Sequence, residues 1–173
     1  MTTTETRLPP LTYQGETLEA DHVEPMQDAT PLLGDMEAMH RWMDERGYLY
    51  LPGLLGRERV MNARRVIVGR MEKDGLLAPG SDPMDAIGHP TKKSGFAGGR
   101  LETLFDNYQP IQDVLYAGAM MAFFREFLAA EVLHFDYTWM RQVSPGPATS
   151  IHSDVVYMGR GTHRLYTAWT PMG

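Results

Sequence analysis

The sequence contains no cysteine, which excludes disulfide bonds, zinc sites built from thiolates and cysteine nucleophiles. It also lacks an apolar run of about 20 residues, the length that a membrane-spanning helix requires. Residues 1–5 are polar, and no positively charged segment followed by an apolar core marks a secretory signal. We therefore expect a soluble, cytoplasmic protein with no membrane partner.

An excess of basic charge is also missing. The net charge is −6, from 16 basic and 22 acidic side chains, and the basic residues are scattered along the chain. Such a surface repels nucleic acid, so we expect no nucleic-acid partner. The 173 residues, 43% of them hydrophobic, are enough for one globular domain with a hydrophobic core.

The chain divides at residue 35 into an arm and a domain. Residues 1–34 are rich in proline and show little periodicity, which indicates an extended N-terminal arm. In residues 35–173, apolar side chains at helical spacing predict helices over 35–46, 57–74, 111–116 and 120–130. Asp35 is the expected N-cap of the first helix, and Gly47 is expected to end it.

Strands are predicted mainly after residue 131. Apolar and polar residues alternate there with a period of two, which predicts strands over 132–143, 149–158 and 164–170, joined by a Pro-Gly turn at 144–147. A short strand is expected earlier, at 48–51, and the Gly- and Pro-rich stretch 78–100 is interpreted as a functional or disordered loop. Helices followed by strands indicate an α+β fold with a mostly antiparallel sheet.

The triplet His152-Ser153-Asp154 is the candidate metal site. On a strand, residues two apart project from the same face, so the imidazole and the carboxylate are expected to converge. Together with one more imidazole they would form the facial triad that binds iron(II) and leaves coordination positions open. A pair of hydrogen-bonded surface residues is the alternative interpretation of the triplet taken alone.

Several segments in order resemble the phytanoyl-CoA dioxygenase family. They are a Gly-Tyr strand leading into Gly-Leu-Leu, a strand with a Pro-Gly turn, the His-x-Asp segment and an Ala-Trp-Thr segment, at 47–55, 139–146, 151–157 and 167–172. The resemblance covers the chain from about residue 35 onward. It implies helices packed on a double-stranded β-helix, or jelly-roll, core.

The resemblance also implies a function. It implies an iron(II)- and 2-oxoglutarate-dependent dioxygenase that uses dioxygen to hydroxylate a C–H bond of a small organic substrate. His152 and Asp154 would be metal ligands, with no further catalytic group, and Trp139, Trp169 and Arg100 would contact 2-oxoglutarate. Filling of an aromatic core is the alternative for the two tryptophans. Because Asp154 is a carboxylate, hydroxylation is favoured over halogenation.

Two features of the family pattern are not found. A distal histidine ligand and a basic residue that binds the far carboxylate of 2-oxoglutarate would follow the His-x-Asp segment by several strands. His163 is too close to take the distal role, and we interpret it and the other histidines as structural or exposed. We therefore expect a truncated, inactive chain with an incomplete jelly roll.

Two further alternatives stay open. The domain could be a cupin-like or jelly-roll module that binds a metal or small ligand without turnover, or an inactive fragment without metal. The sequence predicts neither the substrate nor the oligomeric state.

Overall fold

A computed structural model describes residues 11–13, 15–19, 21, 23–92, 98–141, 151–159 and 161–172. The chain forms two compact units. The helical unit consists of residues 28–144 and 168–173, and the small unit consists of residues 1–27 and 145–167. Among the described residues, no helix is both long and apolar enough to cross a membrane.

Helix α1, Met36–Arg46, opens the helical part of the chain and has the caps that its sequence predicts. The side chain of Asp35 accepts a hydrogen bond of 2.9 Å from the backbone N–H of Ala38. Gly47 adopts the left-handed conformation, with φ at 75°, and its N–H bonds to the carbonyl of Met43 at 2.8 Å. Both predicted ends of this helix are confirmed.

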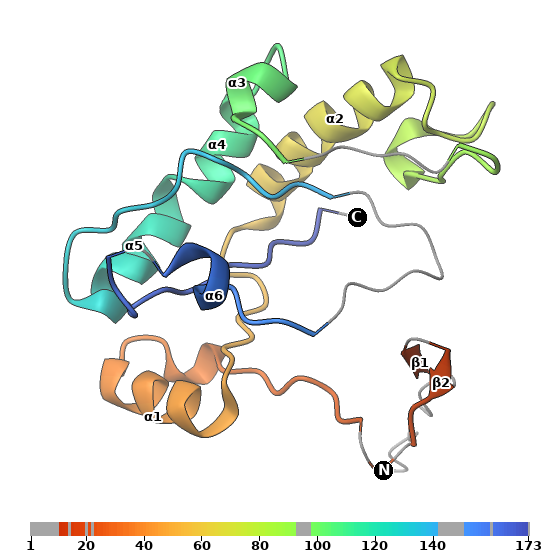
Figure 1. The fold of residues 1–173 in the computed structure, drawn as a ribbon. Coiled ribbons are helices and arrows are strands. Elements are labelled where there is room, and N and C mark those ends of the chain that lie inside the picture. Colours follow the sequence, from red (N-terminus) through yellow and green to blue (C-terminus); the bar gives the residue numbers. More distant parts are fainter. Residues whose placement is uncertain are drawn as a thin grey trace, which may run out of the picture. The chain divides into compact units, whose positions relative to one another are not determined.

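Helix α2, Arg57–Lys73, supplies one wall of the core. It packs against α4, Gln109–Leu115, beside which it lies in Figure 1. The apolar residues at helical spacing that predict this helix form its buried face, because Ala63, Ile67 and Met71 enter the buried cluster. That cluster consists of Ala63, Ile67, Met71, Leu76, Leu77, Leu101, Phe105, Ile111 and Val114.

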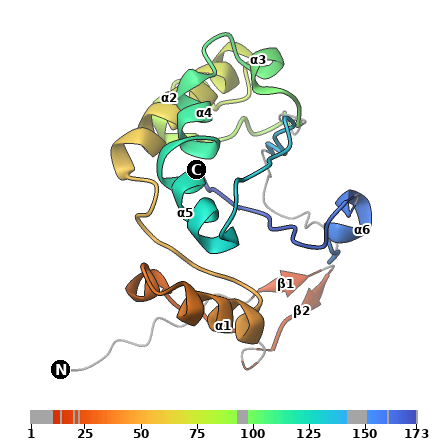
Figure 2. The same ribbon diagram turned by 90° about the vertical axis from the view of Figure 1, so that its left-hand side faces the viewer.

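Helix α5, Gly118–Leu128, connects this core to the first helix. It contacts α4 on one side and α1 on the other (Figure 2). Met120 and Phe127 on it are buried, and the rings of Phe123 and Phe127 stack with their centroids 5.5 Å apart. A further short helix, α3 at Leu101–Leu104, is one that the sequence did not predict.

The loop after α2 has defined structure over residues 76–92. The N–H of Ala78 bonds to the carbonyl of Ile87 at 2.8 Å, and a short 3₁₀ helix, η3 at Pro83–Asp85, lies between them. Arg64 on α2 fixes this loop, because its Nε and Nη2 donate to the carbonyl of Met84 at 3.2 and 2.6 Å. Its Nη1 donates to the carbonyl of Met172, so one guanidinium joins three parts of the helical unit.

The N-terminal arm has more structure than was predicted. Strands β1, Thr12–Tyr13, and β2, Glu16–Thr17, pair antiparallel in the small unit and form the one sheet among the described residues. A 3₁₀ turn, η2 at Thr30–Leu32, follows, and the side chain of Ala29 is fully buried. The domain boundary at residue 35 stays a prediction.

The predicted strands over 48–51, 132–143 and 164–170 are not formed by the described residues. Tyr50 makes one parallel bridge with Asp28, and Thr138 makes one antiparallel bridge with Gly99. Residues 164–170 have no regular secondary structure, and the Pro-Gly turn at 144–147 lies outside the described residues. The sequence does alternate between apolar and polar residues with a period of two, but a strand also requires a hydrogen-bonded neighbour along its length.

The predicted strand over 149–158 is wrong in its described part. Residues 155–158 form α6, Val155–Met158, instead of a strand. The backbone N–H groups of Tyr157 and Met158 bond to the carbonyl of Asp154 at 3.0 and 2.9 Å. These local hydrogen bonds override the β-propensity of two valines and a tyrosine. The jelly-roll core stays a prediction.

Candidate metal centre

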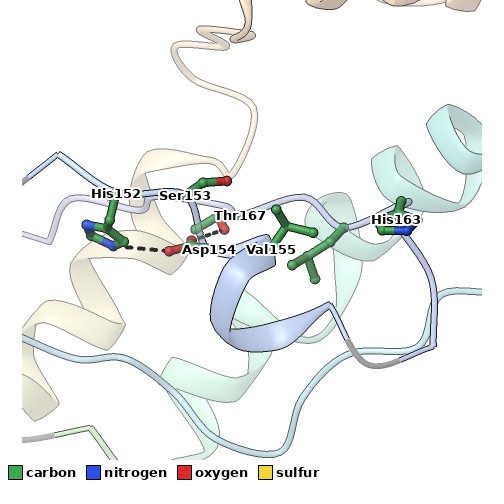
Figure 3. A pocket seen from close by; sticks show the side chains of 7 residues that line it. His152, Ser153, Asp154, Val155, His163 and Thr167 are labelled. Carbon is green, nitrogen blue, oxygen red and sulfur yellow. Dashed lines mark hydrogen bonds and ion pairs between the residues drawn. The ribbon is translucent and has the colours of Figure 1, made fainter.

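His152 and Asp154 lie together in the small unit. The Nε2 atom of His152 is 3.2 Å from Oδ1 of Asp154, and the two side chains are 40% and 30% exposed. Figure 3 shows both side chains on the wall of one pocket. The structure thus brings the two predicted ligands into contact, within reach of solvent.

The backbone that places them is a helical turn. Asp154 is the N-cap of α6 and has φ and ψ of −61° and −30°, which are helical values. The ring of Tyr157, within α6, meets the imidazole of His152 edge to face, with the ring centroids 6.2 Å apart. The convergence expected of a strand is therefore achieved by a different local conformation.

The second carboxylate oxygen of Asp154 has its own partner. Thr167 donates a hydrogen bond of 2.5 Å from Oγ1 to Oδ2 of Asp154. The two oxygens of this carboxylate therefore face different groups, with Oδ1 toward His152 and Oδ2 toward Thr167 (Figure 3). Thr167, the first residue of the 167–172 segment, was not among the predicted site residues.

The pocket around this pair is open and has a volume of about 720 Å³. Apolar and polar side chains share its wall, which consists of His152, Ser153, Asp154, Val155, His163, Leu165 and Thr167. His163 lies apart from the His152–Asp154 pair, on the other side of Val155 in Figure 3. It is exposed, as interpreted, but it also contributes to the pocket.

Tyr13 also fixes the backbone of the site, and the sequence did not predict this role. Its hydroxyl accepts a hydrogen bond of 2.7 Å from the backbone N–H of Ile151, the residue before His152. The hairpin β1–β2 thereby holds the chain next to the candidate ligand. A contact across 138 positions has no signature in local sequence.

The spacing of His152 and Asp154 fits a shared metal ion. Two ligand atoms with metal bonds of about 2.1 Å at a right angle lie about 3 Å apart, and the observed separation is 3.2 Å. An imidazole and a carboxylate are also two of the three donors in the facial triad of ferrous oxygenases. The described residues contain no group of three or more His, Asp or Glu side chains that could bind a metal.

The three residues proposed to contact 2-oxoglutarate belong to the helical unit. Trp139 is about half exposed and packs against the rings of Phe135 and Tyr137, with centroids 6.1 and 4.6 Å away. Trp169 is 81% exposed. Trp169 is therefore too exposed to fill an aromatic core, whereas Trp139 lies in a half-exposed cluster of aromatic rings.

Arg100 forms ion pairs within the helical unit. Its guanidinium bonds to the carboxylate of Asp136 and lies 3.8 Å from Glu102. The hydrogen bond and the charge of Arg100 hold the pKa of Asp136 below its ordinary value, and the same contact raises the pKa of Arg100. An anion that binds Arg100 would therefore compete with Asp136.

Two proteins of known activity resemble the chain. The 1-deoxypentalenic acid 11-beta-hydroxylase of Streptomyces exfoliatus is 31% identical over 153 residues, which cover 84% of this chain and 51% of the relative. The protein of the same name from Streptomyces arenae is 29% identical over 152 residues, with the same coverage. These relatives support an oxygenase family.

They do not single out the phytanoyl-CoA dioxygenase family within it. The chain spans about half the length of these two hydroxylases. No protein-family profile matches the chain, and no solved structure matches it.

Proposed function

We propose that the chain is part of an iron(II)- and 2-oxoglutarate-dependent dioxygenase that hydroxylates a C–H bond of a small organic substrate. The observation that carries the proposal is the 3.2 Å separation of His152 Nε2 and Asp154 Oδ1 in an open pocket. The hydroxylase names of the two relatives support it independently. In the whole enzyme we expect a jelly-roll core around this pair.

In this proposal His152 and Asp154 hold the iron. When bound, the iron together with 2-oxoglutarate and dioxygen supplies the oxidising chemistry. The protein's own residues bind the iron and orient its ligands. Tyr13 fixes the backbone before His152, and Thr167 fixes the orientation of the Asp154 carboxylate.

The proposed cosubstrate contacts are Trp139, Trp169 and Arg100. A guanidinium binds a carboxylate well because its donors match the two oxygens, which is the reason to keep Arg100 in this role. Its present partner Asp136 is exposed, so exchange of one carboxylate for another costs little desolvation.

The substrate is proposed to be a small molecule with an apolar part. Val155 and Leu165 bring apolar surface to the pocket wall beside the proposed ligands. The names of the two relatives state that those enzymes hydroxylate 1-deoxypentalenic acid. A carbon-rich organic acid is therefore the first class of compound to test.

Site-resolved metal binding tests the proposal. The 173-residue chain with ¹³C-labelled histidine is titrated with Co(II), an air-stable substitute for iron(II), and followed by NMR. We expect the ring signals of His152 to be paramagnetically shifted, and we expect His152→Ala or Asp154→Ala to abolish the site. His89→Ala, in the helical unit, is the matched control and should leave the site intact. Unshifted His152 signals would refute the proposal.

A binding module without turnover is the second candidate. The observation that favours it is the lack of a third His, Asp or Glu ligand near the pair among the described residues. Anaerobic iron(II) with 2-oxoglutarate tests whether this chain alone forms an oxygenase site, because chelation of both in such a site gives a visible charge-transfer band. Because the described residues place His152 and Asp154 together without a third such ligand, we expect the chain to give little of this band and no succinate. A strong band would show that these 173 residues carry a complete oxygenase site.

A further inference from the structure

We propose that Thr167 is a positioning residue that makes Asp154 a one-oxygen metal ligand. The inference rests on the proposed function, because it concerns how Asp154 presents itself to a metal. Thr167 was not among the residues that the sequence predicts for the site. Thr167 does not itself touch the metal in this proposal.

The geometry of the carboxylate carries the inference. Oδ2 of Asp154 accepts a hydrogen bond of 2.5 Å from the hydroxyl of Thr167, whereas Oδ1 lies 3.2 Å from Nε2 of His152. An ionised carboxylate has only acceptor oxygens, so the Thr167 hydroxyl must be the donor. Rotation of the carboxylate would break this hydrogen bond, which therefore holds Oδ1 on the side of His152.

The number of oxygens that Asp154 offers matters for the chemistry. A carboxylate that binds through both oxygens occupies two coordination positions, whereas the facial triad requires one position from it. By engaging Oδ2, Thr167 leaves only Oδ1 for the metal and keeps the other positions available. Groups that orient metal ligands in this way change metal affinity about 10- to 100-fold when they are removed.

The same hydrogen bond also joins two parts of the small unit, 13 positions apart in the chain. A purely structural role would make the loss of Thr167 destabilise the unit without changing the way in which a folded chain binds metal. The two roles differ in the metal affinity and in the spectrum of the bound metal. Both quantities are measured on the folded chain and need no catalytic turnover.

The experiment compares Thr167→Val and Thr167→Ser with the unchanged chain. Valine has the shape of threonine but no hydroxyl, and serine keeps the hydroxyl. Co(II) is titrated into the ¹³C-histidine chain, and the dissociation constant is taken from the His152 signals and the coordination from the visible Co(II) spectrum. We expect Thr167→Val to weaken binding about tenfold or more and to alter the spectrum. Thr167→Ser should restore both.

Thr170→Val is the matched control. The hydroxyl of Thr170 is buried and has no hydrogen-bond partner among the described residues, so its loss should leave Co(II) binding unchanged. If Thr167→Val binds Co(II) with the affinity and spectrum of the unchanged chain, the role of Thr167 is refuted and the proposed function stands. If the unchanged chain shows no Co(II) effect on His152, the proposed function fails, and this inference fails with it.

Discussion

The guanidinium of Arg100 is paired with the carboxylate of Asp136, 36 positions further along the chain. Beside this ion pair, Gly99 and Thr138 exchange two backbone hydrogen bonds of 3.0 and 2.8 Å. Tyr116 adds a hydrogen bond of 2.7 Å between its hydroxyl and that of Thr138. The segment that carries Trp139 is thus fixed to the helical unit next to the proposed cosubstrate ligand Arg100.

Replacement of Arg100 by glutamine is expected to raise the pKa of Asp136. Arg100 holds this pKa below the ordinary value of 3.8, so the variant should titrate closer to 3.8. Because the pKa is depressed in the folded state, the pair stabilises the protein above pH 3.8 and loses this contribution as the pH falls through the lowered pKa. The ¹³C signal of the Asp136 carboxyl measures the midpoint. Arg41→Gln, which removes only an exposed pair with Glu37, should not move it.

Loss of Arg64 is expected to destabilise the helical unit. Arg64→Ala removes the hydrogen bonds to the carbonyls of Met84 and Met172. Hydrogen bonds from charged groups contribute about 1.5–3 kcal/mol, and we expect a loss of this order in the free energy of unfolding. Urea denaturation measures it. The neighbour Arg65 is exposed and, within the part of the chain that the structure describes, bonds to Asn62 in its own helix, so Arg65→Ala should change stability by less than about 0.5 kcal/mol. Equal losses of unfolding free energy for Arg64→Ala and Arg65→Ala would contradict a stabilising role for the Arg64 hydrogen bonds.

Two glycine substitutions should have opposite signs. A Cβ at Gly98 would lie 2.5 Å from the ring of Tyr137 and 2.8 Å from the carbonyl oxygen of Thr138, so Gly98→Ala must displace the segment. We expect a loss of about 1–3 kcal/mol, as for other overpacked sites. Gly69 lies within α2 with no atom within 4 Å of a Cβ, and Gly69→Ala should stabilise the helix by about 0.5–1 kcal/mol. Thermal unfolding measures the stability change of each variant. Two changes of the same sign would contradict the opposite environments of Gly98 and Gly69.

The core position Ile111 is expected to dominate stability. Its side chain is 0% exposed within the cluster between α2 and α4, and Ile111→Ala should cost about 2–5 kcal/mol. If that variant does not fold, Ile111→Val should still show a loss of about 0.5–1.5 kcal/mol. Ile87, which is 52% exposed, provides the control. A loss for Ile87→Ala as large as for Ile111→Ala would contradict the observed core.

The helices could be predicted because their signals are local. Asp35 and Gly47 mark both ends of α1, and the spacing of apolar residues marks the buried face of α2. Strands depend on partners that are far away in sequence, as the bridge between Thr138 and Gly99 illustrates. Alternation alone therefore predicted strands for which the described residues provide no neighbour.

The candidate site was predictable to a similar degree. His152 and Asp154 were found because two donors of metal-binding type stand close in sequence, and their 3.2 Å contact forms even without the expected strand. The contacts of Thr167 with Asp154 and of Tyr13 with Ile151 span 13 and 138 positions. Such contacts follow from the folded chain and leave no spacing pattern that the sequence alone could reveal.

The helical unit contains residues on both sides of the segment 145–167, with Met140 before it and Met172 after it packed against the core. The segment that carries His152 and Asp154 is therefore an insertion into a helical scaffold. The entropy of closing a loop rises only slowly with its length, at about 0.6 kcal/mol for each doubling. A change in the length of this segment, which carries the two candidate ligands, should therefore cost the helical scaffold little free energy.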